Sequence, residues 1–398
     1  MSRTRAVLPA LLVAVALPRG AAAQAPASAP APVRLAIAGL THGHVHGILA
    51  REKKGDVEIV GIAERNGELA RRYAAHYGVD PSLLFDDLAA MLDRVRPEAV
   101  AAFGPTSDHL AVVEACAPRK VHVMVEKPLA LTLAEGRRMA ELAAAHGVHV
   151  LTNYETTWYG SHRKMSDLVL RDRRVGAIRK MVVHDGHPGP VKIGVEPEFL
   201  EWLTDPARNG GGAIMDFGCY GADLMTWLMQ GERPVSVTAV TQQLQPDVYP
   251  RVDDEATIVV TYPSAQGIIQ ASWNWPFSRK DTYVYGEKGT VFALDSRRVR
   301  YRPGDAEKEI EAPPPPPPAD EPFAYLAAVV RGAMTVAPTD LSSLPVNLTV
   351  MEILDAARES ARTGRTIRLE AERPSRRSDS RAFAGDNARQ AEVSRRAP

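Results

Sequence analysis

The sequence predicts an α/β protein with two domains: an N-terminal parallel sheet flanked by helices, and a C-terminal α+β domain with an open, mainly antiparallel sheet. Between residues 33 and 152, short apolar, β-branched runs alternate with helical patterns, as in a doubly wound parallel sheet. From residue 153 onward, strand-like runs mostly follow one another with turn residues between them. The 398 residues, 45% of them hydrophobic, are enough to fill two cores.

The N-terminal domain, residues 33–152, combines five strand patterns with five helix patterns. Its strands are continuous apolar runs, which suit strands covered on both faces. Strands are predicted at 33–39, 57–63, 99–103, 121–125 and 148–152, and helices at 45–54, 68–77, 85–94, 107–117 and 133–146.

The C-terminal domain, residues 153–370, has a different rhythm, with five of its strands in one uninterrupted series. Six consecutive prolines at 313–318 predict an extended surface loop. Strands are predicted at 178–184, 235–243, 255–262, 267–273, 282–286 and 290–294, and helices at 161–171, 210–229, 322–331 and 348–363.

The two ends of the chain do not have the composition of a folded domain. Residues 1–23 contain early arginines, an apolar run and a final Ala-Ala-Ala, which predicts a cleavable signal peptide. Residues 24–32 read as an Ala/Pro linker and residues 371–398 as a disordered tail. We therefore expect a secreted or periplasmic protein with no stable membrane insertion after signal removal.

Charge and cysteine content exclude two further classes. The chain has 48 basic and 48 acidic side chains, whereas a dedicated nucleic-acid binder is usually basic. The two cysteines, Cys116 and Cys219, fall in different predicted domains. We expect both to be unpaired, so the protein is not a disulfide scaffold.

The turn after the first strand has the character of a nucleotide-binding loop. Gly39 stands at the end of that strand, but Thr41 and His44 occupy the places of the second and third glycines of the usual G-x-G-x-x-G pattern. Glu64 ends the second strand, where an acidic residue binds the ribose hydroxyls of NAD. The neighbouring Arg65 leaves NADP possible. These features predict a Rossmann domain that binds NAD.

Four motifs occur in the order typical of one family. They are Gly-Pro-Thr-Ser-Asp-His at 104–109, Glu-Lys-Pro at 126–128, the glycine run and Asp-x-Gly-x-Tyr-x-x-Asp at 210–223, and Tyr-Gly-Glu-Lys-Gly-Thr at 285–290. Together they resemble the Gfo/Idh/MocA family of glucose–fructose oxidoreductase and inositol dehydrogenase, over residues 33–369. The resemblance implies a nicotinamide-dependent oxidoreductase that acts on a sugar or cyclitol and assembles as a homo-oligomer, a dimer or tetramer. It also implies cofactor contacts from Pro105, Thr106, His109, Glu126 and Lys127.

The resemblance also implies the catalytic residues. Lys127 matches the family lysine that contacts substrate and cofactor, and Asp216 matches the aspartate that orients the acid/base. The family histidine is replaced by Tyr220, as in the glucose–fructose oxidoreductase branch. A tyrosine ordinarily has a pKa near 10, and we expect Lys127 and a cationic nicotinamide to lower it.

Three histidines in the first turn leave a second interpretation open. His42, His44 and His46 form H-x-H-x-H, a spacing that occurs at metal sites and would suit a metal-dependent hydrolase. We favour no metal and a modified phosphate loop, in which His42, Gly43 and His44 present backbone N–H groups to the dinucleotide.

The substrate side is predicted from the segment after the fifth strand. Asn153 and Tyr154 offer an amide and an aromatic face, which suit a sugar ring, and Asp223 and Lys127 complete the predicted substrate contacts. Further candidates for the pocket lining are His184, Asp185, His187, Trp273, Asn274 and Trp275.

Export conflicts with a dissociable nicotinamide cofactor, because free cofactor is not maintained outside the cytoplasm. We therefore expect an exported oxidoreductase that acts on a hydroxyl or carbonyl of a sugar, cyclitol or glycoside and retains its cofactor tightly. Two alternatives remain besides the hydrolase. One is a redox-neutral, NAD-dependent enzyme that cleaves glycosides, and the other is a non-catalytic carbohydrate-binding protein on a relic Rossmann fold.

Overall fold

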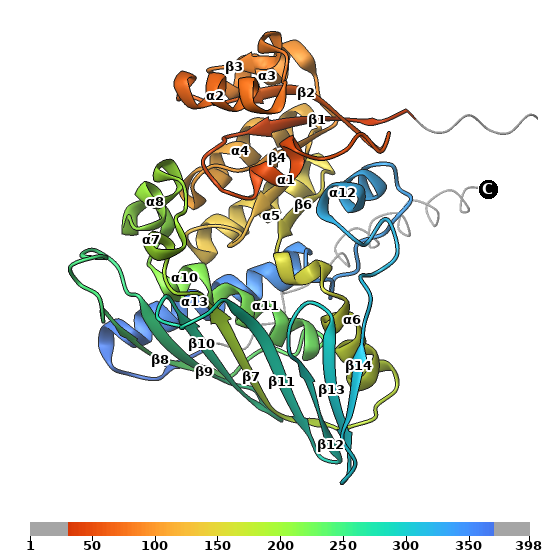
Figure 1. The fold of residues 1–398 in the computed structure, drawn as a ribbon, viewed down its shortest axis with the longest axis vertical. Helices are drawn as coiled ribbons and strands as arrows, with labels where there is room; N and C mark the ends of the chain where they lie inside the picture. Colours follow the sequence, from red (N-terminus) through yellow and green to blue (C-terminus); the bar gives the residue numbers. More distant parts are fainter. Residues whose placement is uncertain (1–30, 370–398) are drawn as a thin grey trace, which may run out of the picture. The chain divides into compact units, whose positions relative to one another are not determined.

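Two β-sheets organise the chain in the computed structural model, which describes residues 31–369 (Figure 1). The predicted signal peptide, almost all of the predicted linker and the predicted tail lie outside these residues. Residues 32–369 form one compact unit, because a single apolar core continues from one face of the first sheet to the helices of the second.

The first sheet has six parallel strands in the order β3-β2-β1-β4-β5-β6, which confirms the predicted parallel sheet. The strand order reverses between β1 and β4, and ligands bind at such a switch point. Its strands are β1 (Val33–Ala38), β2 (Val57–Ala63), β3 (Leu84–Phe85), β4 (Ala99–Ala102), β5 (His122–Glu126) and β6 (Val150–Asn153).

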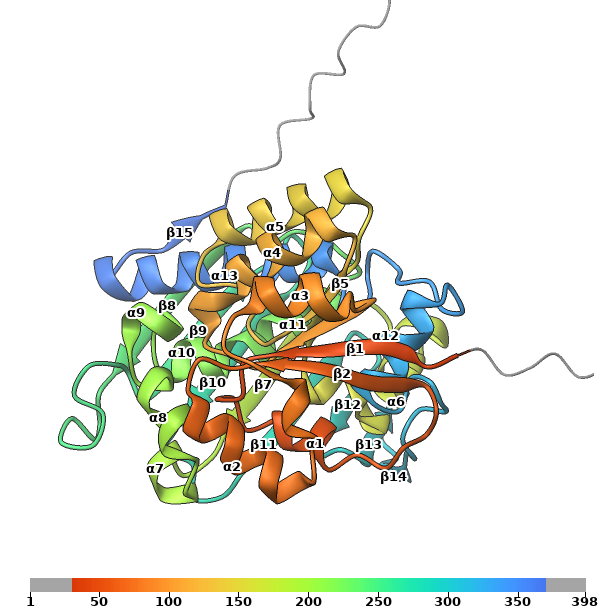
Figure 2. The same cartoon turned by 90° about the horizontal axis from the view of Figure 1, so that it is seen from above.

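Helices cover both faces of the first sheet (Figure 2). Side chains of β1 alternate between the two faces: Ala36 and Ala38 pack with α3, α4 and α5, whereas Leu35 and Ile37 pack with α1, α2 and α12. The helices on the first face are α3 (Leu88–Val95), α4 (His109–Cys116) and α5 (Leu133–His146), and those on the second are α1 (Val45–Leu49), α2 (Gly67–Tyr77) and α12 (Pro322–Val330).

The long helices begin and end where local capping chemistry allows. The Thr132 hydroxyl accepts from the N–H of Glu135 at the start of α5, and Asn66 caps α2 in the same way. Gly78 and Gly147 end these helices with left-handed backbone, which a glycine adopts without steric cost. The predicted bounds of both helices are therefore correct to within one residue.

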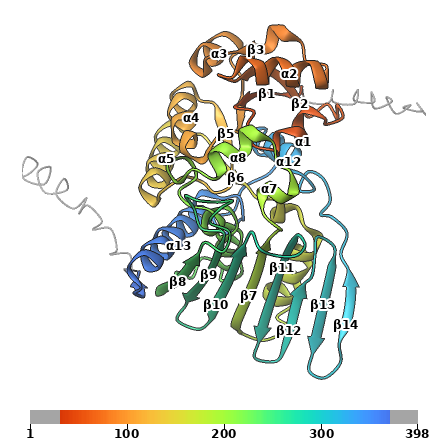
Figure 3. The ribbon, with the colours of Figure 1, turned by 60° about the vertical axis from the view of Figure 1, so that its left-hand side comes forward.

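The second sheet has nine strands in the order β14-β13-β12-β11-β7-β10-β9-β8-β15 (Figure 3). All neighbours are antiparallel except β7 and β10, as the predicted open, mainly antiparallel sheet requires. The strands are β7 (Ile178–Gly186), β8 (Ser236–Gln242), β9 (Glu255–Thr261), β10 (Gln266–Ser272), β11 (Arg279–Gly286), β12 (Gly289–Ala293), β13 (Arg298–Pro303), β14 (Lys308–Glu311) and β15 (Ile367–Arg368).

Helices α6, α10, α11 and α13 pack on this second sheet, and α13 also contacts α5 of the first layer. Helices α8 and α9 contact each other, and α9 also contacts residues 106–108 after β4. The apolar side of α12 belongs to the core of the first sheet. The helices are α6 (Gly160–Ser166), which continues as a π-helix at Asp167–Arg171, then α7 (Pro190–Ile193), α8 (Pro197–Leu203), α9 (Pro206–Asn209), α10 (Ala213–Asp216), α11 (Gly218–Leu228) and α13 (Leu344–Thr363).

The predicted helix at 45–54 is wrong beyond Leu49. Arg51 instead turns back to bind both carboxylate oxygens of Asp56, at 2.8 and 2.6 Å, and also Glu321. The predicted helix at 210–229 is broken as well. The Asp253 carboxylate accepts from the backbone N–H of Gly212 and of Ile214, so the glycine run bends before α10 begins.

The prediction missed several short or polar elements. Helices α7 and α8 are too short to give a clear helical period. Strands β13 and β14 carry mostly charged side chains at the edge of the sheet, where charge discourages pairing with other chains. Cys116 and Cys219 are both buried and free, as expected. Within residues 31–369, no helix is both long and apolar enough to cross a bilayer.

Candidate active site

The loops after β1, β4, β5 and β6 leave the same edge of the first sheet and meet helices α10 and α11 of the second layer (Figure 1). The parallel strands bring their carboxyl ends together at this edge, where ligands of open α/β sheets bind. Most of the predicted site residues stand on these loops.

A cavity of about 530 Å³ opens at this edge between β1, β2 and β4. The predicted cofactor residues that line it are Gly39, Thr41, Glu64, Arg65, Pro105 and His109. Gly39 has φ +82°, and a Cβ there would meet the backbone N of Gly104 at 2.7 Å. Only glycine therefore lets the loops after β1 and β4 approach so closely, and the residues present fit a dinucleotide.

Glu64 holds the nucleotide loop in shape. Its carboxylate accepts from the N–H of Leu40 at 2.7 Å and from the N–H of Asn66 at 2.8 Å. The same carboxylate faces the cavity, where a negative charge favours a ribose with free hydroxyls over a 2′-phosphate. Arg65 also lines the cavity. The site therefore favours NAD over NADP, and the nearby Arg65 guanidinium weakens that preference.

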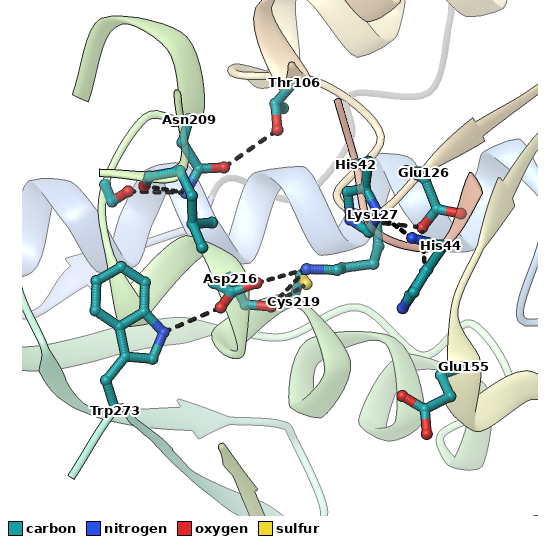
Figure 4. Close-up of polar contacts among 12 residues, drawn as sticks. His42, His44, Thr106, Glu126, Lys127, Glu155, Asn209, Asp216, Cys219 and Trp273 are labelled. Atoms are coloured by element: carbon teal, nitrogen blue, oxygen red, sulfur yellow. Dashed lines mark hydrogen bonds and ion pairs between the residues drawn. The ribbon is translucent and has the colours of Figure 1, made fainter. Parts of the chain in front are cut away.

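Lys127 and Asp216 form a buried ion pair at the inner end of this edge (Figure 4). The Lys127 Nζ lies 2.5 Å from Asp216 Oδ1, and the Trp273 Nε1–H donates to Asp216 Oδ2 at 3.0 Å. Burial is the largest single influence and opposes both charges, but other groups together outweigh it. Asp216, Cys219 and Glu126 raise the pKa of Lys127, whereas Lys127, His187 and Trp273 lower the pKa of Asp216. The two predicted catalytic residues are thus brought together from segments 89 positions apart.

Tyr220 stands beside this pair, but its expected activation is wrong. The Lys127 Nζ lies 5.6 Å from the Tyr220 ring centroid and already binds Asp216. Burial raises the pKa of Tyr220 well above 10, and the nearby Glu155 raises it further. The phenol therefore stays protonated near neutral pH, so it can donate a hydrogen bond but does not serve as a base in this state.

Glu126 is the centre of a second buried cluster. Its Oε2 lies 2.9 Å from the Nδ1 of His44, and its Oε1 accepts from the Nδ2 of Asn153 at 2.7 Å. The Oδ1 of Asn153 in turn accepts from the indole N–H of Trp158 at 3.0 Å. Burial alone would raise the pKa of Glu126, but His44, His42 and these hydrogen bonds lower it to about 2. Glu126 is therefore ionised at any physiological pH.

The three histidines of the first turn diverge. His46 binds Glu196 at 2.8 Å and Tyr77 at 2.7 Å, away from the other two. His42 is buried, with its ring 4.7 Å from that of Phe199. The metal site predicted as an alternative from all three histidines is therefore not formed.

His42, His44 and Glu126 have ligand atoms that all lie within 4.8 Å of one another, the sole such group of three in the part of the chain that is described. The Nδ1 of His42 accepts the backbone N–H of His44 at 3.1 Å, so the proton of a neutral His42 lies on Nε2. A metal ion would need a lone pair on that same Nε2. Burial lowers the His42 pKa well below its usual value, which keeps this ring neutral. The tautomer therefore disfavours a metal at these residues.

The remaining predicted contacts fall into two groups. Thr106 donates to the Oδ1 of Asn209 at 3.2 Å, and Asn153 supports Glu126. Tyr154 and Asp223 are fully buried, and the Tyr154 hydroxyl donates to Asn347. Neither side chain reaches the surface of the site. Their roles as substrate contacts stay predictions, and their burial argues against those roles.

Sequence reasoning missed Lys280 of β11, whereas Asp185 of β7 was among its candidates for the pocket lining. Lys280 binds Glu155 at 2.5 Å, and its Nζ lies 5.2 Å from the ring centroid of Tyr220. Lys280 pairs with Asp185 in the sheet register. Asp185 is fully buried with no hydrogen-bond partner for either carboxylate oxygen, and burial raises its pKa well above the usual value. Only sheet pairing brings these residues under Tyr220, and no local motif marks Lys280.

Two sequence models match the chain, one for each sheet. The model described as "Oxidoreductase family, NAD-binding Rossmann fold" matches residues 33–154. The model described as "GFO/IDH/MocA C-terminal domain" matches residues 162–292. The Rossmann sheet, the close approach of the loops at Gly39 and Gly104, and the buried Lys127 thus define an NAD(P)-dependent oxidoreductase that binds NAD. The chain belongs to the Gfo/Idh/MocA family.

Relatives in this family act on several alcohols and ketones. The chain is 26% identical over 237 residues to trans-1,2-dihydrobenzene-1,2-diol dehydrogenase of Xenopus laevis, which covers 59% of this chain and 67% of the relative. It is 25% identical over 274 residues to myo-inositol 2-dehydrogenase of Thermotoga maritima, 67% of this chain and 76% of the relative. A match to dTDP-3,4-didehydro-2,6-dideoxy-alpha-D-glucose 3-reductase of Streptomyces antibioticus, at 31% identity, covers 42% of this chain and 47% of the relative.

Solved structures share the fold over most of the chain. The aldose-aldose oxidoreductase of Caulobacter crescentus superposes with a TM-score of 0.71 at 22% identity, over 85% of this chain and 100% of that one. An inositol dehydrogenase homolog of Azotobacter vinelandii, solved with NAD+, has a TM-score of 0.71 at 19% identity, over 85% and 98%.

Proposed function

We propose that this protein is an exported NAD-dependent dehydrogenase or reductase of a polyhydroxylated substrate, a sugar, cyclitol or vicinal diol. The observation that carries the proposal is the buried Lys127–Asp216 pair at the same edge of the first sheet as the nucleotide cavity. Burying two charges costs desolvation free energy, so a buried ion pair is weak evidence for a stabilising role and suggests a functional one. We propose that this pair places a charged donor where a substrate oxygen would meet the cofactor. The diol and inositol dehydrogenases among its relatives support the substrate class.

The chain's own residues would position and polarise the substrate. The Lys127 ammonium binds the reacting oxygen and stabilises negative charge that develops on it. Asp216 keeps Lys127 protonated, and Trp273 fixes the direction of the carboxylate. Gly39 and Glu64, which border the cavity, would hold NAD, and NAD would supply the hydride acceptor for alcohol oxidation.

Export and tight cofactor retention form the second part of the proposal. They rest on the signal-like residues 1–23 and on the absence of a maintained nicotinamide pool outside the cytoplasm. An aldose-aldose oxidoreductase is among the proteins of the same fold. A homo-oligomer remains a proposal that follows from the family resemblance.

A nucleotide extraction tests the proposal directly. The protein purified from the periplasm without added nucleotide should have lost residues 1–23, as measured by intact mass, and should release about one equivalent of NAD(H) on acid denaturation. Lys127→Met should reduce NAD reduction with myo-inositol, D-glucose or a cyclic diol by at least about 100-fold. The matched control is Lys120→Met, an exposed lysine that binds the carbonyl of His146, and it should retain full activity. Protein that neither contains nor binds NAD(H) would contradict the proposal.

A further inference from the structure

His44 and Glu126 form a histidine–carboxylate dyad that the proposed chemistry has not yet used. The two side chains come from the loop after β1 and from the last residue of β5, 82 positions apart, and their atoms lie 2.9 Å from each other. Glu126 is 1% exposed and ionised, so Nδ1 of His44 donates its hydrogen to it. The other nitrogen, Nε2, is then the one left to exchange a proton.

The dyad is held rigidly from its buried side. Asn153 donates to the second oxygen of Glu126, and Trp158 donates to Asn153. These hydrogen bonds favour the orientation of the carboxylate in which Oε2 faces His44. A carboxylate that fixes the tautomer and direction of a histidine is the arrangement that general acid/base catalysis requires.

The open side of the dyad faces the candidate site. The His44 side chain is 37% exposed, whereas that of Glu126 is not. Figure 4 shows the His44 ring between the Glu126 carboxylate and Glu155. Burial raises the pKa of Glu155, but Lys280, Tyr159 and, to a smaller degree, His44 lower it. His44 is therefore within electrostatic reach of Glu155, which in turn raises the pKa of Tyr220.

Tyr220 leaves a chemical gap that His44 fills. Oxidation of a carbinol needs a group that accepts the hydroxyl proton. Tyr220 occupies the position of the family histidine, yet its phenol stays protonated, and Lys127 is held as an ammonium by Asp216. The His44 ring is oriented by an ionised carboxylate and is 37% exposed, whereas His187, the histidine near Asp216, only accepts the backbone N–H of Gly189 at its Nδ1.

We propose that His44, oriented by Glu126, is the general acid/base of this protein, in place of the histidine that Tyr220 has replaced. This inference rests on the proposed dehydrogenase function. In the oxidative direction, the substrate carbon loses its C–H electron pair as hydride to the nicotinamide, and the substrate oxygen loses its proton to the Nε2 of His44 as the C=O bond forms. His44 then returns that proton to water, and reduction runs the same steps in reverse.

Kinetics of His44→Gln provide the first test. The kcat/KM for oxidation should fall about 100-fold or more, while the dissociation constant for NADH stays at the wild-type value. The wild-type rate should fall on the acid side of its pH profile, where a base is protonated, and this limb should vanish in the variant. The groups that face His44 are Glu126, His42 and Glu155, so Glu155→Gln serves to show that the limb does not belong to that carboxylate.

His46→Gln is the matched control, because His46 stands in the same turn but binds Glu196 and Tyr77. It should keep wild-type activity and NADH affinity. Added imidazole should restore part of the activity of His44→Ala, which a purely structural role would not allow. Wild-type kcat/KM in His44→Gln, or a loss of NADH binding equal to the loss of rate, would overturn the proposal.

The dyad is also testable without turnover. In nucleotide-free protein labelled with ¹⁵N-histidine, the Nδ1–H of His44 should give a far-downfield proton signal, absent from His44→Gln and shifted upfield in Glu126→Gln. A stoichiometric zinc ion lost in His44→Gln would instead assign these residues to a metal site and overturn the dyad. If the wild type neither binds NAD(H) nor oxidises any polyol, the proposed dehydrogenase function fails even where this signal is present. Failure of the proposed function is therefore distinguishable from failure of the His44–Glu126 dyad.

Discussion

Two buried carboxylates at the same edge of the sheet, Asp216 and Glu126, each hold a basic side chain in a different setting. Lys127 and Asp216 are both almost fully buried, at 6% and 5% exposed, whereas Glu126 is buried under a His44 that is 37% exposed. The sealed pair keeps Lys127 charged, because Asp216 raises the pKa of Lys127. The half-open pair leaves the His44 ring in contact with solvent, as the proposed proton transfer requires. The difference separates electrostatic stabilisation from proton transfer.

The sealed pair should show the largest effect when it is broken. Asp216→Asn leaves the Lys127 ammonium buried without a counter-charge, so the free energy of unfolding should fall by about 3–5 kcal/mol, measured by urea denaturation at pH 7. Asp93→Asn is the matched control, since its partner Arg119 holds it at the surface, and should leave stability unchanged. A double variant, Lys127→Met with Asp216→Leu, should recover most of the loss. Full stability in Asp216→Asn would show that the pair is not sealed as the structure has it.

The half-open pair should show its effect in the pH dependence of stability. The Glu126 pKa is lowered from 4.5 to about 2 in the folded protein, so the unfolded state binds more protons between these values. The stabilisation is therefore complete above pH 4.5 and is lost as the pH falls toward 2, by about 3 kcal/mol in total. Unfolding free energies of the wild type and Glu126→Gln, measured from pH 7 to 3, should converge as the pH falls. A constant difference would contradict the lowered pKa.

Tyr220→Phe should have the smallest effect. It removes a hydroxyl that has no hydrogen-bond partner in the described structure and leaves the ring that packs at 5.4 Å from Tyr154. We expect kcat/KM to fall less than about tenfold, since a lost neutral hydrogen bond is worth about 1 kcal/mol. The acid limb of the pH profile should be unchanged. Loss of that limb would make Tyr220, and not His44, the proton acceptor.

Much of the site could be predicted because its motifs are local. Gly39 follows an apolar strand, Glu64 ends the next one, and Glu126 with Lys127 follows the fourth predicted strand. Backbone geometry dictates Gly39, since a tight turn between a buried strand and the following segment demands glycine, whereas Glu126 and Lys127 belong to a short motif that resembles the family's. Such requirements are visible in a single stretch of chain.

What could not be predicted depends on side chains that meet across the fold. His44 was predicted to present its backbone N–H to the dinucleotide. In the structure its ring meets Glu126, because β1 and β5 are parallel, flank β4 and end at the same edge of the sheet. Lys280 comes under Tyr220 only through the register of β11 with β7. The activation expected for Tyr220 was wrong because burial outweighs the charge of a lysine that Asp216 already binds.

The sequence alone determined the α/β class, the order of the two sheets and the nucleotide loop, because hydrophobic period and backbone turns are local properties of the chain. Lys127 and Asp216 were predicted from the resemblance of the sequence motifs to a known family. Tertiary structure alone decided which carboxylate is sealed and which reaches water. Desolvation depends on every segment that packs around a group, and those segments come here from both sheets.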